Sequence, residues 1–282
     1  MNEPRSIVFV HAHPDDESLS TGGTIARYAA EGVRVCLVTC TDGDLGEIAE
    51  VDGLVPERIE PRLGEVRREE LREAADALGI SDVRMLGYRD SGMAGTAGND
   101  DPAAFVNQDL DGVVRQLVQV LREVRPQVVV TYNAYGFYGH PDHIRAHQAT
   151  VAAVEASADP GSLPEAGPPH EVRRLYYTAV PKSGLRELRD RVPGAEEVFS
   201  DEAIETIGAE DHEISAFVDV RAWVPQKMAA LRAHRTQMGT IAPFLSMPEE
   251  VLELVLGVEF YELADRTGGS PVVSDLFEGL ET

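Results

Sequence analysis

The sequence predicts an α/β fold in which a mostly parallel β-sheet is flanked by helices on both faces. Short runs rich in Val, Ile and other apolar residues alternate along the chain with longer amphipathic segments. The short runs are apolar at nearly every position, as expected for strands that are covered on both sides. Alternation of strands and helices is typical of parallel sheets whose strands are joined by crossover helices.

Five segments predict the strands of this sheet. Residues 6–10 (SIVFV) are β-branched or apolar almost throughout, and residues 126–132 (PQVVVTY) contain a near-continuous apolar run. The other expected strands span residues 33–39, 82–86 and 174–178. Helical periodicity separates these runs. We expect helices at residues 21–31, 62–78, 110–124, 141–156, 223–234 and 249–256.

One internal boundary divides the chain. Residues 159–169 (DPGSLPEAGPP) are rich in Pro and Gly, which interrupt regular structure. We expect residues 1–158 to form the catalytic domain, which contains both of the polar clusters described below. Residues 159–282 are then a smaller C-terminal elaboration that completes the sheet and the substrate pocket. At 282 residues, the two parts fit a single compact unit.

The charge balance limits the partners of the protein. A formal net charge of −24 repels nucleic acid and anionic lipid, so we expect neither nucleic acid nor a membrane as partner. The N-terminus lacks a basic region followed by an apolar one, and no apolar run approaches the roughly 20 residues of a membrane span. We therefore expect a cytoplasmic protein, with a homo-oligomer left open. Cys36 and Cys40 are expected to be inert core thiols.

A first polar cluster follows the first predicted strand, where residues 11–18 read HAHPDDES. Uncompensated, its three adjacent carboxylates would repel one another and raise each other's pKa values, and a divalent cation reverses that cost. Pro14 stiffens the turn, and a stiff turn holds ligands at the fixed angles that a metal site requires. The alternative is that the carboxylates cap the following helix. Capping accounts for one carboxylate, but not for three beside two histidines.

A second polar cluster follows the fourth predicted strand, where residues 138–147 read YGHPDHIRAH. His140, His143 and His147 are spaced three and four residues apart. With Pro141 at the first helical position, His143 and His147 lie on one face of a helix. Three histidines within eight residues, with Asp142 among them, indicate a site rather than isolated surface or core histidines.

Binding sites of parallel sheets lie at the carboxyl ends of the strands, so we expect the two clusters to meet there. Together they offer two His and one carboxylate to a metal ion and leave one position open for water, which is the pattern of catalytic zinc. Zinc is therefore the expected cofactor. Iron(II), which also uses two His and a carboxylate, is the alternative. A second carboxylate beside the water can act as a general base.

The HPDDE and HPDH motifs of these clusters resemble those of the PIG-L/LmbE family of zinc-dependent N-deacetylases. The similarity covers about residues 6–156 and is weaker afterwards. RDSGMAGT, at residues 89–96, is more particular to the deacetylase branch. Within the family, the chain is most similar to the N-acetylglucosaminyl-inositol deacetylases of mycothiol biosynthesis. The resemblance implies a Rossmann-like (LmbE-like) fold and metal-dependent removal of the acetyl group from a small N-acetylglucosamine glycoside.

The resemblance also implies roles for the reacting groups. His13, Asp16 and His143 would bind the metal. Asp15 would act as the general base and as the acid for the leaving amine.

Three further residues would act around the acyl group. The resemblance implies that His140 and Tyr138 stabilise the oxyanion of the tetrahedral intermediate, and that Asp142 orients His140. Loss of one oxyanion donor typically costs on the order of a hundredfold in rate.

Substrate contacts are implied at three positions. Arg67 and Asp90 would bind sugar hydroxyls, and Glu47 would line the site. The residues alone leave other interpretations open, since Arg67 fits a solvated helix face, Asp90 a turn and Glu47 an ordinary surface acid. His11 either supports the ligands or is a packed residue. His147 either supports the ligands or faces solvent.

Several functions compete with deacetylation of N-acetylglucosaminyl-inositol. Phe137 stands where the family often has glycine, which puts the sugar in question. The nearest alternatives are a mycothiol-conjugate amidase, which removes a bulkier acyl group, and a deacetylase of another N-acyl amino-sugar glycoside. A non-catalytic ligand-binding protein on the same fold is the alternative from another class. A nucleotide oxidoreductase and a phosphotransferase are disfavoured, because neither GxGxxG nor GxxxxGK[ST] occurs where they require it.

Overall fold

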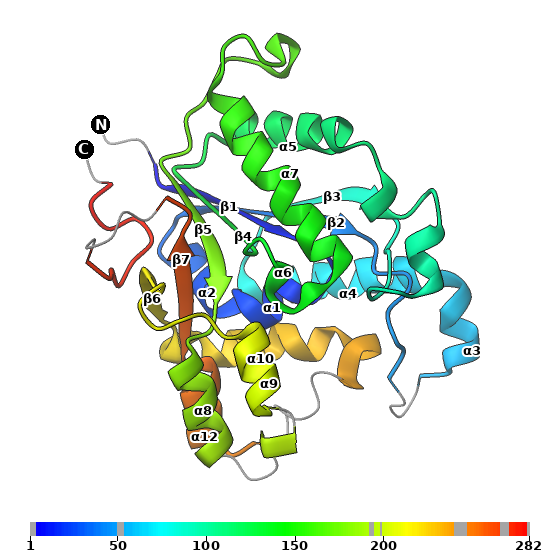
Figure 1. Cartoon of the computed structure of the whole chain (residues 1–282), viewed down its shortest axis with the longest axis vertical. Helices are drawn as coiled ribbons and strands as arrows, with labels where there is room; N and C mark the ends of the chain where they lie inside the picture. Colours follow the sequence, from blue (N-terminus) through cyan, green and yellow to red (C-terminus); the bar gives the residue numbers. More distant parts are fainter. Residues whose placement is uncertain are drawn as a thin grey trace.

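The computed structural model describes residues 4–49, 54–191, 195–197, 199–239, 247–265 and 271–280. Within these residues the chain forms a seven-stranded sheet in the order β3-β2-β1-β4-β5-β7-β6 (Figure 1). The strands are β1 (Ser6–His11), β2 (Arg34–Thr41), β3 (Asp82–Tyr88), β4 (Val128–Thr131), β5 (Arg174–Ala179), β6 (Ala216–Asp219) and β7 (Val258–Leu263).

Helices cover both faces of the sheet (Figure 1). Those described are α1 (Asp16–Ser20), α2 (Gly22–Ala30), α3 (Pro56–Ile59), α4 (Leu63–Leu78), α5 (Leu110–Val124), α6 (Gly136–Gly139), α7 (Pro141–Ala158), α8 (Lys182–Arg191), α9 (Asp201–Ile207), α10 (Val224–Ala233) and α12 (Glu249–Leu256). Short 3-10 turns lie at Glu60–Arg62, Ala97–Asp100, Phe105–Asn107, Pro164–Ala166, Ala195–Glu197, Arg221–Trp223 and Arg235–Gln237. None of the described helices has the length and apolarity needed to cross a membrane.

The core has two layers because strand side chains alternate between the faces of the sheet. In β1, Ile7 and Phe9 pack with α2, α4 and α10 on one face, whereas Val8 and Val10 pack with α5 and α7 on the other. Every residue of β1 is buried. This explains the apolar run at residues 6–10 and confirms the predicted α/β fold, with its mostly parallel sheet flanked by helices.

The order of the strands reverses direction beside β1. From β1 the chain goes to β2 and then β3 on one side, whereas β4 and β5 lie on the other side, all four pairs being parallel. Ligands of open α/β sheets bind in the crevice that such a switch point creates at the carboxyl ends of the strands. The loops after β1 and β4, which carry the two polar clusters, begin at this point.

The remaining strands differ from the expectation. β7 pairs antiparallel with both β5 and β6, so the C-terminal part extends the same sheet with an antiparallel edge. The sequence analysis did not predict β6, β7, α8 or α9. The expected helix at residues 21–31 corresponds to α2. α1, which Thr21 at φ −135° separates from α2, was expected as part of the polar turn and not as a helix. The division into domains at residue 158 stays a prediction.

Arg122 anchors the Pro- and Gly-rich segment after α7. Its guanidinium is buried and donates hydrogen bonds only to backbone carbonyl groups among its described contacts. The acceptors are Ala156, Ser157, Asp159, Ser162, Leu163 and Gly167, at 2.6–3.2 Å. A cation at the C-terminus of α7 also complements the helix dipole. One side chain therefore satisfies the carbonyl groups of a segment with little regular structure.

We expect Arg122→Met to lower the free energy of unfolding by about 3–4 kcal/mol, because several buried carbonyl groups lose their donor. Arg115→Met is the matched control. Arg115 lies on the same helix and pairs with Glu165 of the same segment, but both side chains are about half exposed. An exposed pair of this kind contributes about 0–1 kcal/mol. Urea denaturation of both variants measures the difference, and equal losses would contradict the role of Arg122.

Candidate metal centre and active site

The loops after β1 and β4 bring three ligand-type atoms together. His13 Nδ1 lies 3.2 Å from His143 Nε2 and 3.4 Å from Asp16 Oδ2, and His143 Nε2 lies 3.4 Å from the same oxygen. A tetrahedral ion with bonds of about 2.0–2.1 Å keeps neighbouring ligand atoms roughly 3.3–3.4 Å apart. The three atoms therefore fit one face of a tetrahedral metal site.

The charges around His13 also fit a cation. Burial lowers the pKa of His13, but Asp90, Asp142 and Asp16 outweigh it and hold that pKa well above its usual range. Carboxylates thus surround this one imidazole. Burial lowers the pKa of His143 to about 4, so its ring is neutral, which is the form that binds metal. Burial raises the pKa of Asp16, yet the neighbouring His143 and His13 keep it well below its usual range.

Two other groups of side chains around His13 meet the spacing of a metal site. His13, His140 and His143 offer nitrogen atoms within 4.8 Å of one another, as do His13, Asp90, His140 and Asp142 with their nitrogen and oxygen atoms. We favour the group of His13, Asp16 and His143, because its three distances are the ones that ligands of a single small ion adopt.

Asp142 contacts the ring nitrogen of His13 that faces away from the other two ligand-type atoms, which is Nε2. Its Oδ2 lies 3.2 Å from His13 Nε2 and accepts from the backbone N–H of Ser91 at 2.9 Å, while the hydroxyl of Ser91 donates to Oδ1. A carboxylate on the far nitrogen of a ligating histidine fixes its ring and tautomer. The resemblance implied that Asp142 orients His140. In the structure the Asp142 carboxylate contacts His13 instead, and its backbone N–H donates to His140 Nδ1 at 3.1 Å.

Tyr132 holds Asp16 in the same way. Its buried hydroxyl donates to Asp16 Oδ2 at 2.7 Å and accepts from the backbone N–H of Ala12 at 2.8 Å. His11 lies behind it, with Nδ1 3.1 Å from the Tyr132 hydroxyl and Nε2 2.9 Å from Thr21 Oγ1. His11 is thus a buried support for the cluster. His147 Nδ1 lies 2.9 Å from the carbonyl oxygen of Tyr132, and the His147 ring packs against Tyr177.

Asp15 stands beside the ligands in a strained backbone conformation. Its φ of 124° lies in the left-handed region, where a residue with a side chain is rare. Its carboxylate is 23% exposed and lies 3.2 Å from Arg67 Nη2. Burial raises the pKa of Asp15 to about 6, with Arg67 opposing the shift and Asp16 adding to it. A partly exposed carboxyl with a pKa nearer neutrality suits a general base.

His140 lies against His13, and Tyr138 lies against His143. His140 Nδ1 accepts the N–H of Asp142, and burial lowers the pKa of His140 to about 4. The neutral ring therefore carries its proton on Nε2, where it can donate. The Tyr138 hydroxyl is 3.4 Å from His143 Nε2, and burial raises its pKa, so it also remains a donor. Tyr138 is 40% exposed and reaches the site from the surface.

Of the three expected sugar contacts, two are buried and one is exposed. Asp90 is buried, with Oδ1 3.6 Å from His13 Nε2. Arg67 is also buried, and its Nη atoms donate to the carbonyl groups of Pro14 and Gly43 as well as facing Asp15. Glu47 is exposed on the loop after β2. The structure therefore places Arg67 against the HPDDE turn, and a role for these three residues in substrate binding stays a prediction.

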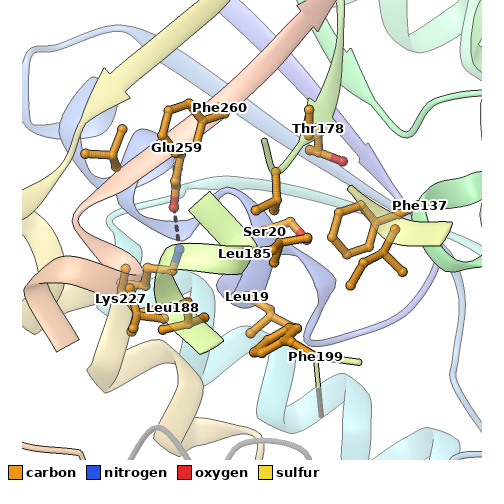
Figure 2. A pocket seen from close by; sticks show the side chains of 16 residues that line it. Leu19, Ser20, Phe137, Thr178, Leu185, Leu188, Phe199, Lys227, Glu259 and Phe260 are labelled. Atoms are coloured by element: carbon orange, nitrogen blue, oxygen red, sulfur yellow. Dashed lines mark hydrogen bonds and ion pairs between the residues drawn. The ribbon is translucent and has the colours of Figure 1, made fainter. Parts of the chain in front are cut away.

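An apolar pocket of about 280 Å³ is lined in part by residues that are close in sequence to both polar clusters (Figure 2). Leu19, three residues after Asp16, and Phe137, next to Tyr138, form two of its walls. The opposite walls come from β5, α8, α9, α12 and β7, and a buried ion pair between Lys227 and Glu259 lies at its edge, at 2.6 Å. The pocket joins the second half of the chain to the loops that carry the ligands.

Sequence reasoning missed three buried polar side chains around the site, which are Ser91, Tyr132 and His234. Glu17 was placed in the first polar cluster, but its contacts with the N–H of Asp15 and with His234 were not predicted. Ser91 lies in RDSG and Tyr132 ends a predicted strand, so their positions at strand ends were available signals. His234 lies alone in LRAHRTQ, 217 residues from its partner Glu17, and no local pattern distinguishes it.

Comparisons with known proteins agree with the two motifs. Residues 8–154 match the family described as PIG-L: GlcNAc-PI de-N-acetylase. A protein from Thermomonospora curvata is 47% identical over 98% of this chain and 97% of its own length. A protein from Streptomyces avermitilis is 44% identical over 98% and 97%. Both are named 1D-myo-inositol 2-acetamido-2-deoxy-α-D-glucopyranoside deacetylase. The family expected from the motifs is confirmed.

Solved structures confirm the fold. The N,N'-diacetylchitobiose deacetylase of Pyrococcus horikoshii has a TM-score of 0.62 at 22% identity, over 93% of this chain and 83% of its own. The 4-carboxy-2-hydroxymuconate hydratase of Pseudomonas putida has a TM-score of 0.59 at 19% identity, over 93% and 97%. Since a deacetylase and a hydratase share the fold, the fold alone does not specify the reaction.

We expect His13→Ala and His143→Ala each to weaken zinc binding at least about a hundredfold, because loss of a ligand costs more than the 10–100-fold of a supporting residue. His147→Ala is the control, since His147 lies on the same helix as His143 but its ring contacts a backbone carbonyl and Tyr177 among the described residues. Zinc titration of the metal-depleted proteins measures the affinities. Full affinity in His143→Ala would contradict the ligand set.

Proposed function

The chain belongs to the PIG-L family, and from that premise we propose that it removes the acetyl group from 1D-myo-inositol 2-acetamido-2-deoxy-α-D-glucopyranoside. The observation that carries the proposal is the group of His13, Asp16 and His143 at 3.2–3.4 Å with Asp15 beside it. The substrate follows from two relatives that match 98% of this chain at 44–47% identity and carry this activity in their names. The products are acetate and the free amino sugar.

His13, Asp16 and His143 would hold the ion, and zinc is the ion we propose, with iron(II) as the alternative. Two neutral nitrogen donors and one carboxylate are the donor set of catalytic zinc sites. When bound there, such an ion would polarise the acyl carbonyl and lower the pKa of a neighbouring water.

Among the side chains around the ligands, Asp15 transfers protons and the others bind or orient. Asp15 takes a proton from water as the water oxygen bonds to the acyl carbon. It returns that proton to the nitrogen as the C–N bond breaks, so that the amine leaves neutral. The former carbonyl oxygen is negative in the tetrahedral intermediate. It then accepts hydrogen bonds from Nε2–H of His140 and from the hydroxyl of Tyr138. Asp142 keeps His13 oriented throughout.

The apolar pocket favours a second candidate within the same chemistry. A substrate consisting only of a sugar, an inositol and an acetyl group has little to place against Leu19, Phe137, Leu185 and Phe199 (Figure 2). An amide with a larger apolar group, as in a mycothiol S-conjugate or another N-acyl amino-sugar glycoside, would bury that group there at about 25 cal/mol per Å².

We expect Asp15→Asn to lower kcat by about 10²–10⁴-fold, because Asn cannot accept a proton, while zinc content stays near one ion per chain. Metal analysis beside steady-state kinetics tests both parts. Asn retains the size of Asp and one oxygen that can accept from Arg67, so the turn should remain folded. A rate within tenfold of the unaltered chain would remove Asp15 from the role of base.

We expect higher kcat/KM on N-acetylglucosaminyl-inositol than on a mycothiol S-conjugate. Acetate or amine release from both compounds, measured with the same zinc-loaded protein, decides between the two candidates. Faster turnover of the conjugate would make the amidase the better assignment. In that case Phe137→Gly, which opens the pocket wall, should change the ratio of the two rates. Release from neither compound, nor from a panel of N-acetyl glycosides, would support the non-catalytic alternative.

A further inference from the structure

The strained turn at Asp15 must be held by its surroundings. A residue with a side chain at φ 124° costs about 1–3 kcal/mol relative to an ordinary conformation, and such residues persist only where neighbouring contacts fix them. The carboxylate of Asp15 faces Arg67 at 3.2 Å. Its backbone N–H donates to Glu17 Oε2 at 2.9 Å. The second contact acts on the backbone itself and therefore on the strained angle.

Glu17 is in turn fixed by a residue from the second half of the chain. Glu17 is fully buried, and its other oxygen, Oε1, accepts from His234 Nε2 at 2.8 Å and from the hydroxyl of Ser18. His234 is also fully buried and follows α10, where its carbonyl accepts from Gln237 N–H at 3.0 Å. A buried carboxylate held from both oxygens has a single orientation.

We propose that His234 is a positioning residue that acts through Glu17 to hold the backbone of Asp15 in its strained conformation. The inference rests on the proposed function for the consequence in rate, because the position of Asp15 affects kcat in this way if Asp15 is the base. His234 lies in no metal-ligand motif, and within the described part of the chain the hydrogen bond from its ring to the HPDDE turn is the one to the Glu17 carboxylate. Its effect should therefore fall on kcat and leave the metal and the binding of substrate almost unchanged.

Two substitutions of nearly equal size separate positioning from packing. In His234→Gln, the amide nitrogen can occupy the place of Nε2 and donate to Glu17. In His234→Asn, the amide is one methylene shorter and corresponds to Nδ1, which has no partner among the described residues. Thr236→Val is the control, because Thr236 lies on the same turn but binds Glu70 of α4 rather than Glu17.

We expect His234→Asn to lower kcat about 10–100-fold, with KM and zinc content within about twofold, since an error of 1 Å in a reacting group can cost a hundredfold. His234→Gln should stay within about threefold of the unaltered chain, and Thr236→Val should keep its kcat despite reduced stability. The proposal would be overturned if His234→Gln and His234→Asn lost kcat equally, or if the loss appeared in KM alone. It would also be overturned if Thr236→Val lost as much kcat as His234→Asn.

A crystal structure of His234→Asn gives a second measurement that does not depend on the reaction. The φ of Asp15 should leave the left-handed region, and an unchanged φ would contradict the inference even if the rate fell. Absence of deacetylation in the unaltered chain would instead refute the proposed function. If His234→Asn does not fold, Ser18→Ala serves in its place, because it removes the other donor to Glu17 Oε1. Its kcat should fall with KM unchanged, and native kcat would count against the inference.

Discussion

The approach of His13, Asp16 and His143 to within 3.2–3.4 Å of one another is the contact on which the rest of the site depends. Two imidazole nitrogens and a carboxylate oxygen do not gather at such distances without cost, because burial removes the water that would solvate them. The protein offsets that cost with a layer of buried partners. Asp142 orients His13, and Tyr132 donates to Asp16. These partners hold the three ligand-type atoms within 3.2–3.4 Å of one another.

The topology explains why residues about 130 positions apart form this contact. β1 and β4 are adjacent and parallel, with Ile7, Val8 and Phe9 opposite Val128, Val129 and Val130. Their carboxyl ends therefore lie side by side, and the chain leaves them in opposite directions toward α1 and α7. A one-residue shift of either strand would turn its side chains to the other face of the sheet. The apolar pairs of the two strands thus set the register on which the polar cluster depends.

Much of this arrangement could be predicted from the sequence, and the exceptions have physical reasons. The parallel strands and long helices have strong periodicities, and HPDDE and HPDH concentrate ligand-type side chains within short turns. β6 and β7 escaped prediction because partial exposure gives them mixed patterns, such as the buried–exposed alternation of AFVD. Partners such as His234 and Glu259 escaped because their roles arise from tertiary contacts across more than 200 residues. Asp142 was expected to orient His140, its neighbour in the motif, whereas in the fold its carboxylate contacts His13 and its backbone N–H contacts His140.

The second half of the chain holds the first polar turn in place. Glu259 of β7 accepts from the backbone N–H groups of Gly23 and Thr24 at the start of α2 and is paired with Lys227 of α10. A carboxylate there stabilises the helix through its unpaired N–H groups and its dipole. His234 binds Glu17 of α1, the helix that precedes α2. Both ends of the segment from Asp15 to Thr24 are therefore fixed by residues that come after position 220. A site whose ligands all lie before position 144 thus still requires the C-terminal part of the chain for its geometry.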